Sequence, residues 1–565
     1  MFKGARRCFP FILFCFFAVY CSAAASKPNV VLVTLESTRA DRVGFLGAKG
    51  VSTPNLDRLA GESLVFEHAY AQAPGTVVSH ASLLTGTYPQ TTGMSEIGGL
   101  LPANIPFLPD VLKAQGYKTA AFVGSIDLDP RNGLAQGFDR GFSSYDAGFH
   151  PALPGDAHPP LTARRGDQVV AKAVAWIAAN SKAPFFAWIQ INDAHGPSAA
   201  YNASVTAADA AVGKLIVGLR QQKLEATTAI VVVADHGESL GAHGEDGHGI
   251  FLYEETIHVP LLVRLAEAQP APKRVAAKVR VIDVAPTILE IAGVPVPSQM
   301  QGQSLVRVAR STGGDQPAFS RADLPQRGFG WSALESWRAG KYLYIRAPKP
   351  ELYDLVADPG ATHNLAQSSK ATLDTLAAQL ESFDRRFSGD AGKSSSGELS
   401  SSEMQKLASL GYVGLQKSAS AGAAATGTDP KDKIAVANKV DEGSTAADQG
   451  KADRAIAALQ PVVGGDPGLY MAQFSLGVAL AQKARYADAA KALHKAVELQ
   501  PDSGWAHFWM GSSLLKTGDS KTAAVHLEIA AGRVASFAPA HLALAEAYEK
   551  LGRAEDAKKE RAKGK

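Results

Sequence analysis

Short apolar runs alternate with amphipathic stretches over roughly the first 390 residues of the 565-residue chain. The runs at residues 30–35, 119–123, 185–191 and 229–233 are almost continuously apolar, unlike the strict alternation of a half-exposed strand. Continuous apolar strands separated by helices are typical of a parallel sheet that is covered on both faces. The pattern therefore predicts an α/β domain over residues 27–390, with a mostly parallel central sheet flanked by helices.

The last part of the chain repeats with a period of 34 residues. Small residues recur at one position as Gly443, Gly477, Gly511 and Ala545, and at another as Ala455, Ala489, Ala523 and Ala557. This spacing resembles the tetratricopeptide pattern, in which small residues lie where paired helices touch. We therefore expect an all-α tetratricopeptide solenoid over residues 431–565, with a concave face for a protein or peptide. An alanine-rich helical bundle without a groove is the alternative.

The segment between these two parts, residues 391–430, is rich in Ser, Ala, Gly and Lys. Such a composition is typical of a flexible linker. One short apolar stretch, residues 407–412, interrupts it. We expect this stretch to pack back on the first domain.

The first 25 residues have the features of a cleaved secretory signal. A basic start with Lys3, Arg6 and Arg7 precedes an apolar core at residues 9–20 and small residues at 22–25. The apolar core has about 12 residues, whereas a membrane span needs roughly 20. We expect cleavage near Ala25 and a periplasmic or secreted protein, and a retained anchor is the alternative.

Cysteine content and charge exclude several classes of function. The three cysteines, Cys8, Cys15 and Cys21, all lie in the signal segment, so the mature chain has no thiol for a disulfide or a metal. The formal charge of +3 disappears with the three basic residues of that segment. A neutral chain without a basic stripe gives no reason to expect a nucleic-acid partner.

Polar side chains follow two of the predicted strands directly. Glu36 comes after the run at 30–35, and Asp235 and His236 come after the run at 229–233. The carboxyl ends of parallel strands form one edge of a sheet, where sites are built. A carboxylate and imidazole set suits Zn²⁺ or Mn²⁺. A single strand-end acid is more often a surface residue, so the prediction of a metal site depends on these residues coming together.

Thr76 stands at the start of a predicted helix. The helix N-terminus offers its positive dipole end and amide groups to an anionic ester. A divalent cation on the hydroxyl oxygen would lower the hydroxyl pKa, as it does for bound water. The alternative is that Thr76 only caps the helix.

These segments resemble the sulfatase family of the alkaline-phosphatase superfamily. Residues 75–86 are similar to its nucleophile segment, C/S-x-P-S-R-A-S-L-L-T-G, with Thr76 at the first position, Val78 for the proline and His80 for the arginine. Further matches lie at residues 53–60, 230–238, 251–256 and 283–289. Sulfatases oxidise the first residue to formylglycine, which threonine cannot form because its Cβ carries a methyl group. The resemblance therefore implies a threonine nucleophile and no formylglycine.

The resemblance also suggests roles for further residues. Residues 192–197 are similar to the family segment D-P-H-x-P, which makes His195 a candidate general acid. In many sulfatases a lysine near the position of His248 contacts the sulfate group. A protonated His248 could make that contact, which makes it a second candidate catalytic residue, or it could join Asp193 and His195 around a second metal. Imidazole suits the general-acid task because it titrates near neutral pH. His80, Asp193 and His243 are candidate substrate-binding residues.

The metal set Glu36, Thr76, Asp235 and His236 is also similar to that of phosphoethanolamine transferases and lipoteichoic acid synthases. Three functions therefore stay open. The first is an exported hydrolase with one divalent metal ion (Zn, Mn or Ca) that cleaves sulfate, phosphate or phosphonate esters of a glycan or lipid. The second is a phospho-group transferase to a lipid or glycan. The third is a catalytically weak scaffold that acts through its repeats.

Overall fold

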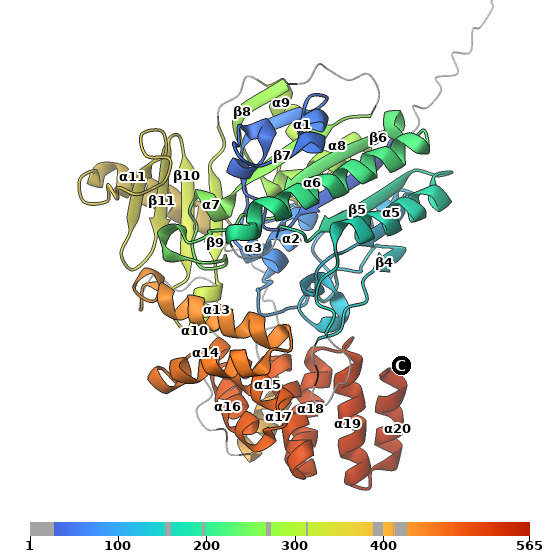
Figure 1. The fold of residues 1–565 in the computed structure, drawn as a ribbon, viewed down its shortest axis with the longest axis vertical. Coiled ribbons are helices and arrows are strands. Elements are labelled where there is room, and N and C mark those ends of the chain that lie inside the picture. Colours follow the sequence, from blue (N-terminus) through green and yellow to red (C-terminus); the bar gives the residue numbers. More distant parts are fainter. Residues whose placement is uncertain are drawn as a thin grey trace, which may run out of the picture.

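The computed structural model describes residues 27–151, 153, 160–194, 198–266, 273–311, 315–387, 399–410, 412 and 427–564. The predicted signal peptide and much of the predicted linker lie outside these residues. In the part of the chain that is described, no helix is both long enough and apolar enough to cross a membrane. The chain forms an α/β domain with a run of helices beneath it (Figure 1).

An eight-stranded sheet forms the centre of the first domain. In spatial order its strands are β4 (Ser144–Asp146), β3 (Lys118–Phe122), β5 (Phe185–Ile191), β1 (Asn29–Leu35), β6 (Thr228–Ala234), β7 (His258–Arg264), β2 (Leu64–Tyr70) and β8 (Lys273–Arg280). Only β7 runs antiparallel to its neighbours. Every residue of β1, β5 and β6 is buried, which explains why their sequences are continuously apolar. The predicted mostly parallel sheet is confirmed.

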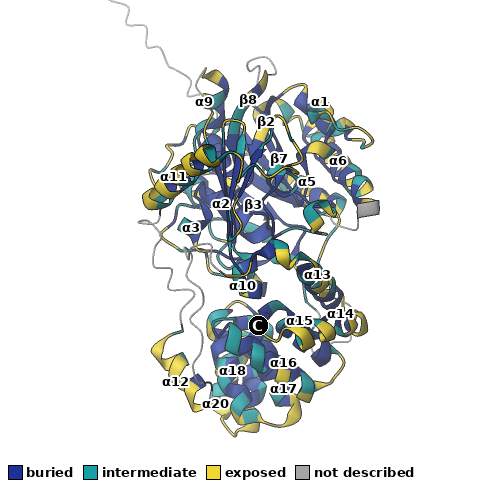
Figure 2. Ribbon diagram, turned by 90° about the vertical axis from the view of Figure 1, so that its left-hand side faces the viewer, coloured by how far each residue is buried: buried dark blue, intermediate teal, exposed yellow. Residues whose placement is uncertain are grey.

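Helices cover both faces of this sheet, with α2 on one side and α5 and α6 on the other (Figure 2). The helices of the domain are α1 (Pro54–Ala60), α2 (Thr76–Thr85), α3 (Pro89–Thr92), α4 (Leu108–Ala114), α5 (Gly166–Asn180), α6 (Ser198–Gln221), α7 (Glu254–Ile257), α8 (Val284–Ile291), α9 (Leu305–Arg310) and α10 (Leu324–Phe329). The arrangement leaves the carboxyl ends of β1 and β6 side by side.

A second, antiparallel sheet follows the first and was not anticipated from the sequence. Its order is β12 (Glu351–Asp354), β11 (Tyr342–Arg346), β10 (Leu334–Ala339) and β9 (Ala318–Ala322). Helix α11 (Lys370–Phe387) packs on it through Leu376, Leu380 and Phe383. This sheet closes one side of the domain.

The C-terminal helices form consecutive antiparallel pairs, as the 34-residue period predicts. They are α13 (Ile434–Asp448), α14 (Ala452–Gly465), α15 (Tyr470–Gln482), α16 (Tyr486–Leu499), α17 (Gly504–Thr517), α18 (Ser520–Arg533), α19 (Ala538–Lys550) and α20 (Ala554–Lys563). A Cβ atom added at Gly443, Gly477 or Gly511 would lie 2.4–2.6 Å from a leucine Cγ of the paired helix. The glycines recur because the two helices leave no room for a side chain.

The apolar stretch at 407–412 packs on the repeat helices, so the expectation that it packs on the first domain was wrong. It ends helix α12 (Ser401–Ser409), and Leu407 and Tyr412 join an apolar cluster with Val497 and Ile529. Glu403 of α12 pairs with Arg533 at 3.0 Å, and Lys406 pairs with Glu528. Helix α12 and the apolar stretch that ends it therefore have both their apolar and their charged partners in the solenoid.

The two domains are in direct contact along several segments. Lys431 Nζ donates to Glu351 Oε1 at 2.6 Å, and Gln136 Nε2 donates to the Arg533 carbonyl at 2.9 Å. Helices α10 and α15 also pack together, because Gly328 leaves room for Met471. The solenoid is thereby docked beneath the carboxyl ends of the central strands.

Candidate functional site

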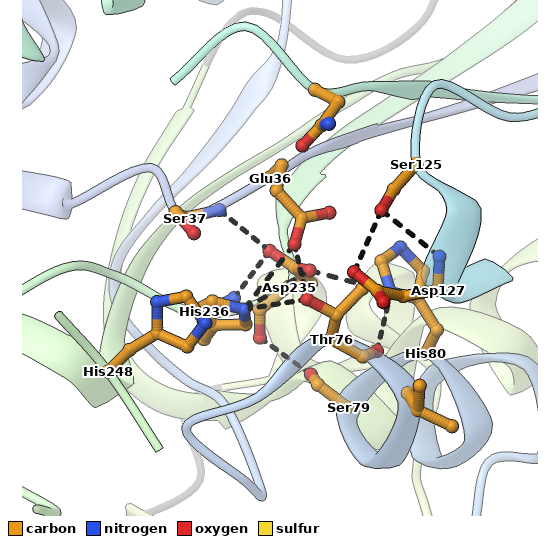
Figure 3. Close-up of polar contacts among 12 residues, drawn as sticks. Glu36, Ser37, Thr76, Ser79, His80, Ser125, Asp127, Asp235, His236 and His248 are labelled. Carbon is orange, nitrogen blue, oxygen red and sulfur yellow. Dashed lines mark hydrogen bonds and ion pairs between the residues drawn. The ribbon is translucent and has the colours of Figure 1, made fainter. Parts of the chain in front are cut away.

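Three ligand-type side chains meet at the carboxyl ends of β1 and β6. Glu36 follows β1, and Asp235 and His236 follow β6. The strands are neighbours in register, with Leu35 opposite Ala234, so the residues that follow them meet. One ligand atom from each of the three side chains lies within 4.8 Å of the others, and all three residues are buried. The sequence prediction that these residues come together is confirmed by this geometry (Figure 3).

The hydrogen bonds of His236 fix which of its ring nitrogens faces the cluster. Nδ1 lies 2.8 Å from the Gly237 carbonyl and therefore carries the proton that it donates there. Nε2 is then unprotonated in the neutral ring, and it faces Thr76 Oγ1 at 3.3 Å and Asp235 Oδ2 at 3.6 Å. A backbone carbonyl on the remote nitrogen is a common support for a metal-binding histidine.

The two buried carboxylates of the cluster need a positive charge between them. Asp235 Oδ1 accepts the backbone N–H groups of Ser37 and His236, at 3.1 and 2.8 Å. Asp235 Oδ2 is buried and has no hydrogen-bond partner. Burial, together with the charge of Glu36, raises the pKa of Asp235 well above its usual value. A carboxylate oxygen without a hydrogen-bond partner, a second carboxylate and an imidazole nitrogen that faces them fit a divalent cation, so these residues could hold one.

Thr76 is the first residue of α2, and its hydroxyl points into the cluster. The helix N-cap is Gly75, so the alternative that Thr76 itself caps the helix was wrong. Thr76 Oγ1 donates a hydrogen bond to Glu36 Oε1 and is only 5 % exposed as a residue. The side chain is therefore positioned by Glu36 rather than by the amides of its own helix.

Glu96 accepts hydrogen bonds from the amides at the start of α2, which we expected to bind an anionic ester. Its carboxylate accepts the N–H groups of Val77 at 3.1 Å and Val78 at 2.9 Å. Burial raises the pKa of Glu96 to about 7. A Cβ at Gly75 would lie 2.5 Å from the Glu96 carboxyl carbon, so only glycine fits there. This residue could not be predicted from the sequence, because Glu96 follows no strand and belongs to no motif.

His80, a predicted substrate-binding residue, lies beneath the site instead. Nδ1 donates to the Thr76 carbonyl at 2.8 Å, and Nε2 accepts from Thr34 Oγ1 at 3.0 Å. The residue is fully buried, and burial lowers the pKa of its ring to about 4, so it is neutral at pH 7. These contacts suit a residue that positions the first turn of α2.

The other predicted site residues divide between the cluster and its surroundings. His248 lies beside the cluster: its ring centre is 4.3 Å from that of His236, and Nδ1 lies 3.3 Å from Glu238 Oε2. Burial lowers the pKa of His248, but the charge of Glu238 outweighs it and the net shift is upward. His243 stacks on Tyr253, and Asp193 accepts the Gly166 amide at the start of α5. His195 lies outside the described residues.

Gln190 orients the carboxylate of Glu36, and it was not predicted from the sequence. Its Nε2 donates to Glu36 Oε2 at 2.5 Å, and its Oε1 accepts the amides of Gly124 and Ser125. Gln190 is a polar residue inside the continuous apolar run of β5, and this interruption was the available signal. A fully bonded buried amide fixes the orientation of the carboxylate beside it.

Comparisons with known proteins agree with the fold. Residues 28–294 match the sulfatase family model, and residues 244–385 match the C-terminal model of N-sulphoglucosamine sulphohydrolase. Residues 440–504 and 510–560 match a tetratricopeptide repeat model. An ulvan-active sulfatase of Formosa agariphila is 27% identical over 63% of this chain and 80% of its own. Arylsulfatase K of Rattus norvegicus is 24% identical over 63% and 78%.

Solved structures share the fold of the first domain. The phosphonate monoester hydrolase of Agrobacterium radiobacter has a TM-score of 0.53 and 19% identity, covering 64% of this chain and 96% of its own. A protein solved with its substrate D-glucosamine-2-N,6-O-disulfate has a TM-score of 0.55 and 18% identity, covering 65% and 100%.

The sulfatase family model and the sulfatases among the relatives place the chain in the class of sulfuric ester hydrolases. The chain belongs to the sulfatase family, and it carries a C-terminal tetratricopeptide domain.

Proposed function

We propose that the protein hydrolyses sulfate esters with Thr76 as its nucleophile and one divalent metal ion as its cofactor. The observation that carries the proposal is the position of Thr76 Oγ1, hydrogen-bonded to Glu36 and 3.3 Å from His236 Nε2. No cysteine lies near this position that could become formylglycine, because all three cysteines precede residue 22. The hydroxyl group itself therefore has to attack the ester.

Glu36, Asp235, His236 and Thr76 would hold the cation. When bound, a divalent cation supplies positive charge that lowers the pKa of the threonine hydroxyl and stabilises negative charge on the ester oxygens. Asp235 Oδ2, which has no hydrogen-bond partner, and His236 Nε2, which faces Thr76 Oγ1, support this assignment. Zn²⁺ and Mn²⁺ suit the mixed nitrogen and oxygen donors, and Ca²⁺ is included in the experiment below as a third candidate.

The reaction has two displacements at sulfur. Thr76 gives its hydroxyl proton to Glu36, and Oγ1 forms a bond to sulfur while the bond from sulfur to the leaving alcohol breaks. His248, held by Glu238, gives a proton to the leaving oxygen. Water then attacks the sulfur of the threonine sulfate, and its proton returns to His248. Inorganic sulfate leaves, and Thr76 regains its proton from Glu36.

The substrate we propose is a sulfated carbohydrate. The relatives include an ulvan-active sulfatase and an N-acetylgalactosamine-6-sulfatase of Sus scrofa, 27% identical over 49% of this chain and 64% of its own. Because threonine suits phosphorus chemistry as well, phosphate and phosphonate esters belong in the same assay. Export through the N-terminal segment would bring the enzyme to such polymers.

The test is the hydrolysis of 4-nitrophenyl sulfate, phosphate and phenylphosphonate after reloading with Zn²⁺, Mn²⁺ or Ca²⁺. We expect sulfate to be preferred, and we expect Thr76→Ala to lose about a thousandfold or more in kcat. Thr76→Ser keeps the hydroxyl and should retain measurable activity. Equal rates for Thr76→Ala and the parent chain would refute the nucleophile, and preference for a phosphorus ester would refute the choice of sulfate.

A further inference from the structure

The first turn of α2 is held by a carboxylate from outside the helix. Gly75, the N-cap residue, has no side chain that could accept the amides of that turn. Glu96 accepts them instead, with one carboxylate oxygen 3.1 Å from the nitrogen of Val77 and the other 2.9 Å from that of Val78. Because Thr76 directly precedes these two residues, the contact fixes the turn that carries the proposed nucleophile.

The loop that carries Glu96, residues 94–101, lies against the repeat domain. Ile97, the next residue along the chain, packs against an apolar cluster. The members of this cluster come from residues 407–412 and from the repeat helices: Leu407, Tyr412, Tyr470, Ala496, Val497, Ala506 and Ile529. The backbone beside Glu96 therefore rests on the repeat domain and on α12.

The end of the same loop is connected to α18 through the turn at residues 133–136. The Leu101 amide donates to the Gln136 carbonyl at 2.9 Å, and Gln136 Nε2 donates to the Arg533 carbonyl at 2.9 Å. A Cβ atom at Gly133 would collide with Val534 Cγ1, so this turn lies directly on the end of α18. The loop thus has a second contact with the repeat domain, through one intervening turn.

The residue before Glu96 is held from the side of α10. Ser95 is hydrogen-bonded to Asp323, the N-cap residue of α10. Helix α10 packs on α15, and Arg327 of α10 lies 3.3 Å from Asp502 of the repeat domain. The backbone on both sides of Glu96 is therefore placed by segments that the repeat domain contacts.

These contacts connect the repeat domain to Thr76 in two steps. The repeat domain places residues 94–101, and Glu96 of that loop places the first turn of α2. A displacement of about 1 Å of a reacting group can cost on the order of a hundredfold in rate. A change in the docking of the repeat domain should therefore alter turnover, although none of its residues belongs to the metal cluster.

We propose that Glu96 is a positioning residue for the Thr76 hydroxyl, and that the docked repeat domain sets the position of Glu96 through residues 94–101. The proposal rests on the proposed function, because it takes Thr76 as the nucleophile. It gives the repeat domain a role within the reaction: it keeps the nucleophile oriented. Substitutions that loosen this docking should lower kcat and leave substrate binding intact.

The kinetics of Glu96→Gln test the positioning role, with 4-nitrophenyl sulfate at pH 8. This pH lies above the pKa of about 7 that burial gives Glu96, so the carboxylate of the parent chain is mostly ionised. The glutamine amide has the same shape but only one acceptor oxygen for the two N–H groups. We expect kcat to fall on the order of tenfold and KM to change little. An unchanged kcat would overturn the proposal, and a lower KM beside it would show that Glu96 only competes with the ester for these amides.

Two substitutions outside the site test the connection to the repeat domain. Ile97→Ala removes contacts with the apolar cluster, and Gln136→Ala removes the hydrogen bond to Arg533. Each should lower kcat severalfold in the parent chain, but not further in Glu96→Gln, because the affected contact is already lost there. Asp432→Asn is the matched control, since Asp432 pairs with Lys349 across the same domain boundary without touching residues 94–101. Losses that add, or no loss in either variant, would overturn the connection.

Hydrogen exchange separates this inference from the catalytic one. The amides of Val77 and Val78 should be protected in the parent chain by their bonds to Glu96. Mass spectrometry of peptides that include residues 75–86 should show faster exchange of these two amides in Glu96→Gln, Ile97→Ala and Gln136→Ala, but not in Asp432→Asn. This result would support the connection even if Thr76 proves not to be the nucleophile. Unchanged exchange in Ile97→Ala and Gln136→Ala would refute the connection whatever the turnover.

Discussion

At the scale of single residues, the site depends on hydrogen bonds that orient its ligand atoms. His236 is turned by the Gly237 carbonyl, Glu36 by Gln190, and Thr76 by Glu36. The sequence could predict Glu36, Thr76, Asp235 and His236, because each follows a strand or starts a helix in a recognisable segment. It could not predict Glu96, because its contact with the amides of α2 depends on how a distant loop folds back.

Asp235→Asn tests the metal assignment without using activity. The amide keeps the shape of the side chain but removes one of two buried negative charges, so we expect metal affinity to fall by about a hundredfold or more. Bound metal is counted by mass spectrometry after dialysis against a metal buffer, and the melting temperature is measured with and without chelator. The parent chain should lose thermal stability on chelation, and Asp235→Asn should not respond. A chelator response of equal size in both would contradict the assignment.

The buried carboxyl group of Glu245 should make the stability of the fold depend on pH. Its carboxylate accepts the amides of Ile250 and Phe251, and burial raises its pKa from 4.5 to about 8. Between these values the folded protein binds more protons than the unfolded chain. The contribution of Glu245 to the free energy of unfolding therefore falls as the pH rises from about 4.5 to 8.

Urea unfolding at several pH values measures this slope. Glu245→Gln should reduce it, because the amide does not titrate. Glu96, whose pKa is raised to about 7, contributes a slope of the same sign in both proteins, over the narrower range from about pH 4.5 to 7. A slope that is unchanged in the variant would show that Glu245 is not the titrating group.

At the scale of elements, the apolar patterns were sufficient where burial alone decides the structure. Strands β1, β5 and β6 and the paired repeat helices follow from continuous apolar runs and from the 34-residue period. The segment at 407–412 was misplaced because an apolar pattern does not say which domain buries it. Leu407 and Tyr412 pack on the solenoid, and the preceding Glu403 and Lys406 pair with Arg533 and Glu528 of the same domain. The small antiparallel sheet was missed because its strands are short and interrupted by charged residues.

The glycines of the repeat predict a contrast between two alanine substitutions. In Gly477→Ala the new Cβ would lie 2.5 Å from Leu493 Cγ, so α15 and α16 must separate, at a cost of about 1–3 kcal/mol. In Gly464→Ala the new Cβ meets no atom within 4 Å, and helix propensity should stabilise α14 by up to about 1 kcal/mol. Thermal unfolding followed by circular dichroism measures both. Equal destabilisation by the two substitutions would refute the close-contact explanation.

At the scale of the whole molecule, two domains could be predicted from the change of pattern, but their docking could not. Contacts such as Lys431 to Glu351 and Gln136 to Arg533 join surfaces that are each polar and unremarkable in sequence. The contacts of α13 with the loop that carries His248 exist only because of this docking.

The N-terminal segment predicts the location of the enzyme. If residues 1–25 direct export, the protein recovered from a bacterial periplasm or medium should begin near Ser26 and lack all three cysteines. Intact-mass measurement of fractionated cells checks both points, with a chain that lacks residues 2–25 as the control. Recovery of the full-length chain in the membrane fraction would favour the retained anchor.

The threonine at the start of α2 has a consequence for how an active enzyme is made. Formylglycine has to be produced by oxidising a cysteine or serine after the chain is synthesised. If Thr76 is the nucleophile, its hydroxyl is complete when the ribosome releases the chain, and folding and metal loading would be the remaining steps. The enzyme should therefore reach full specific activity in cell-free translation or in any expression host, without a maturation partner and independently of oxygen.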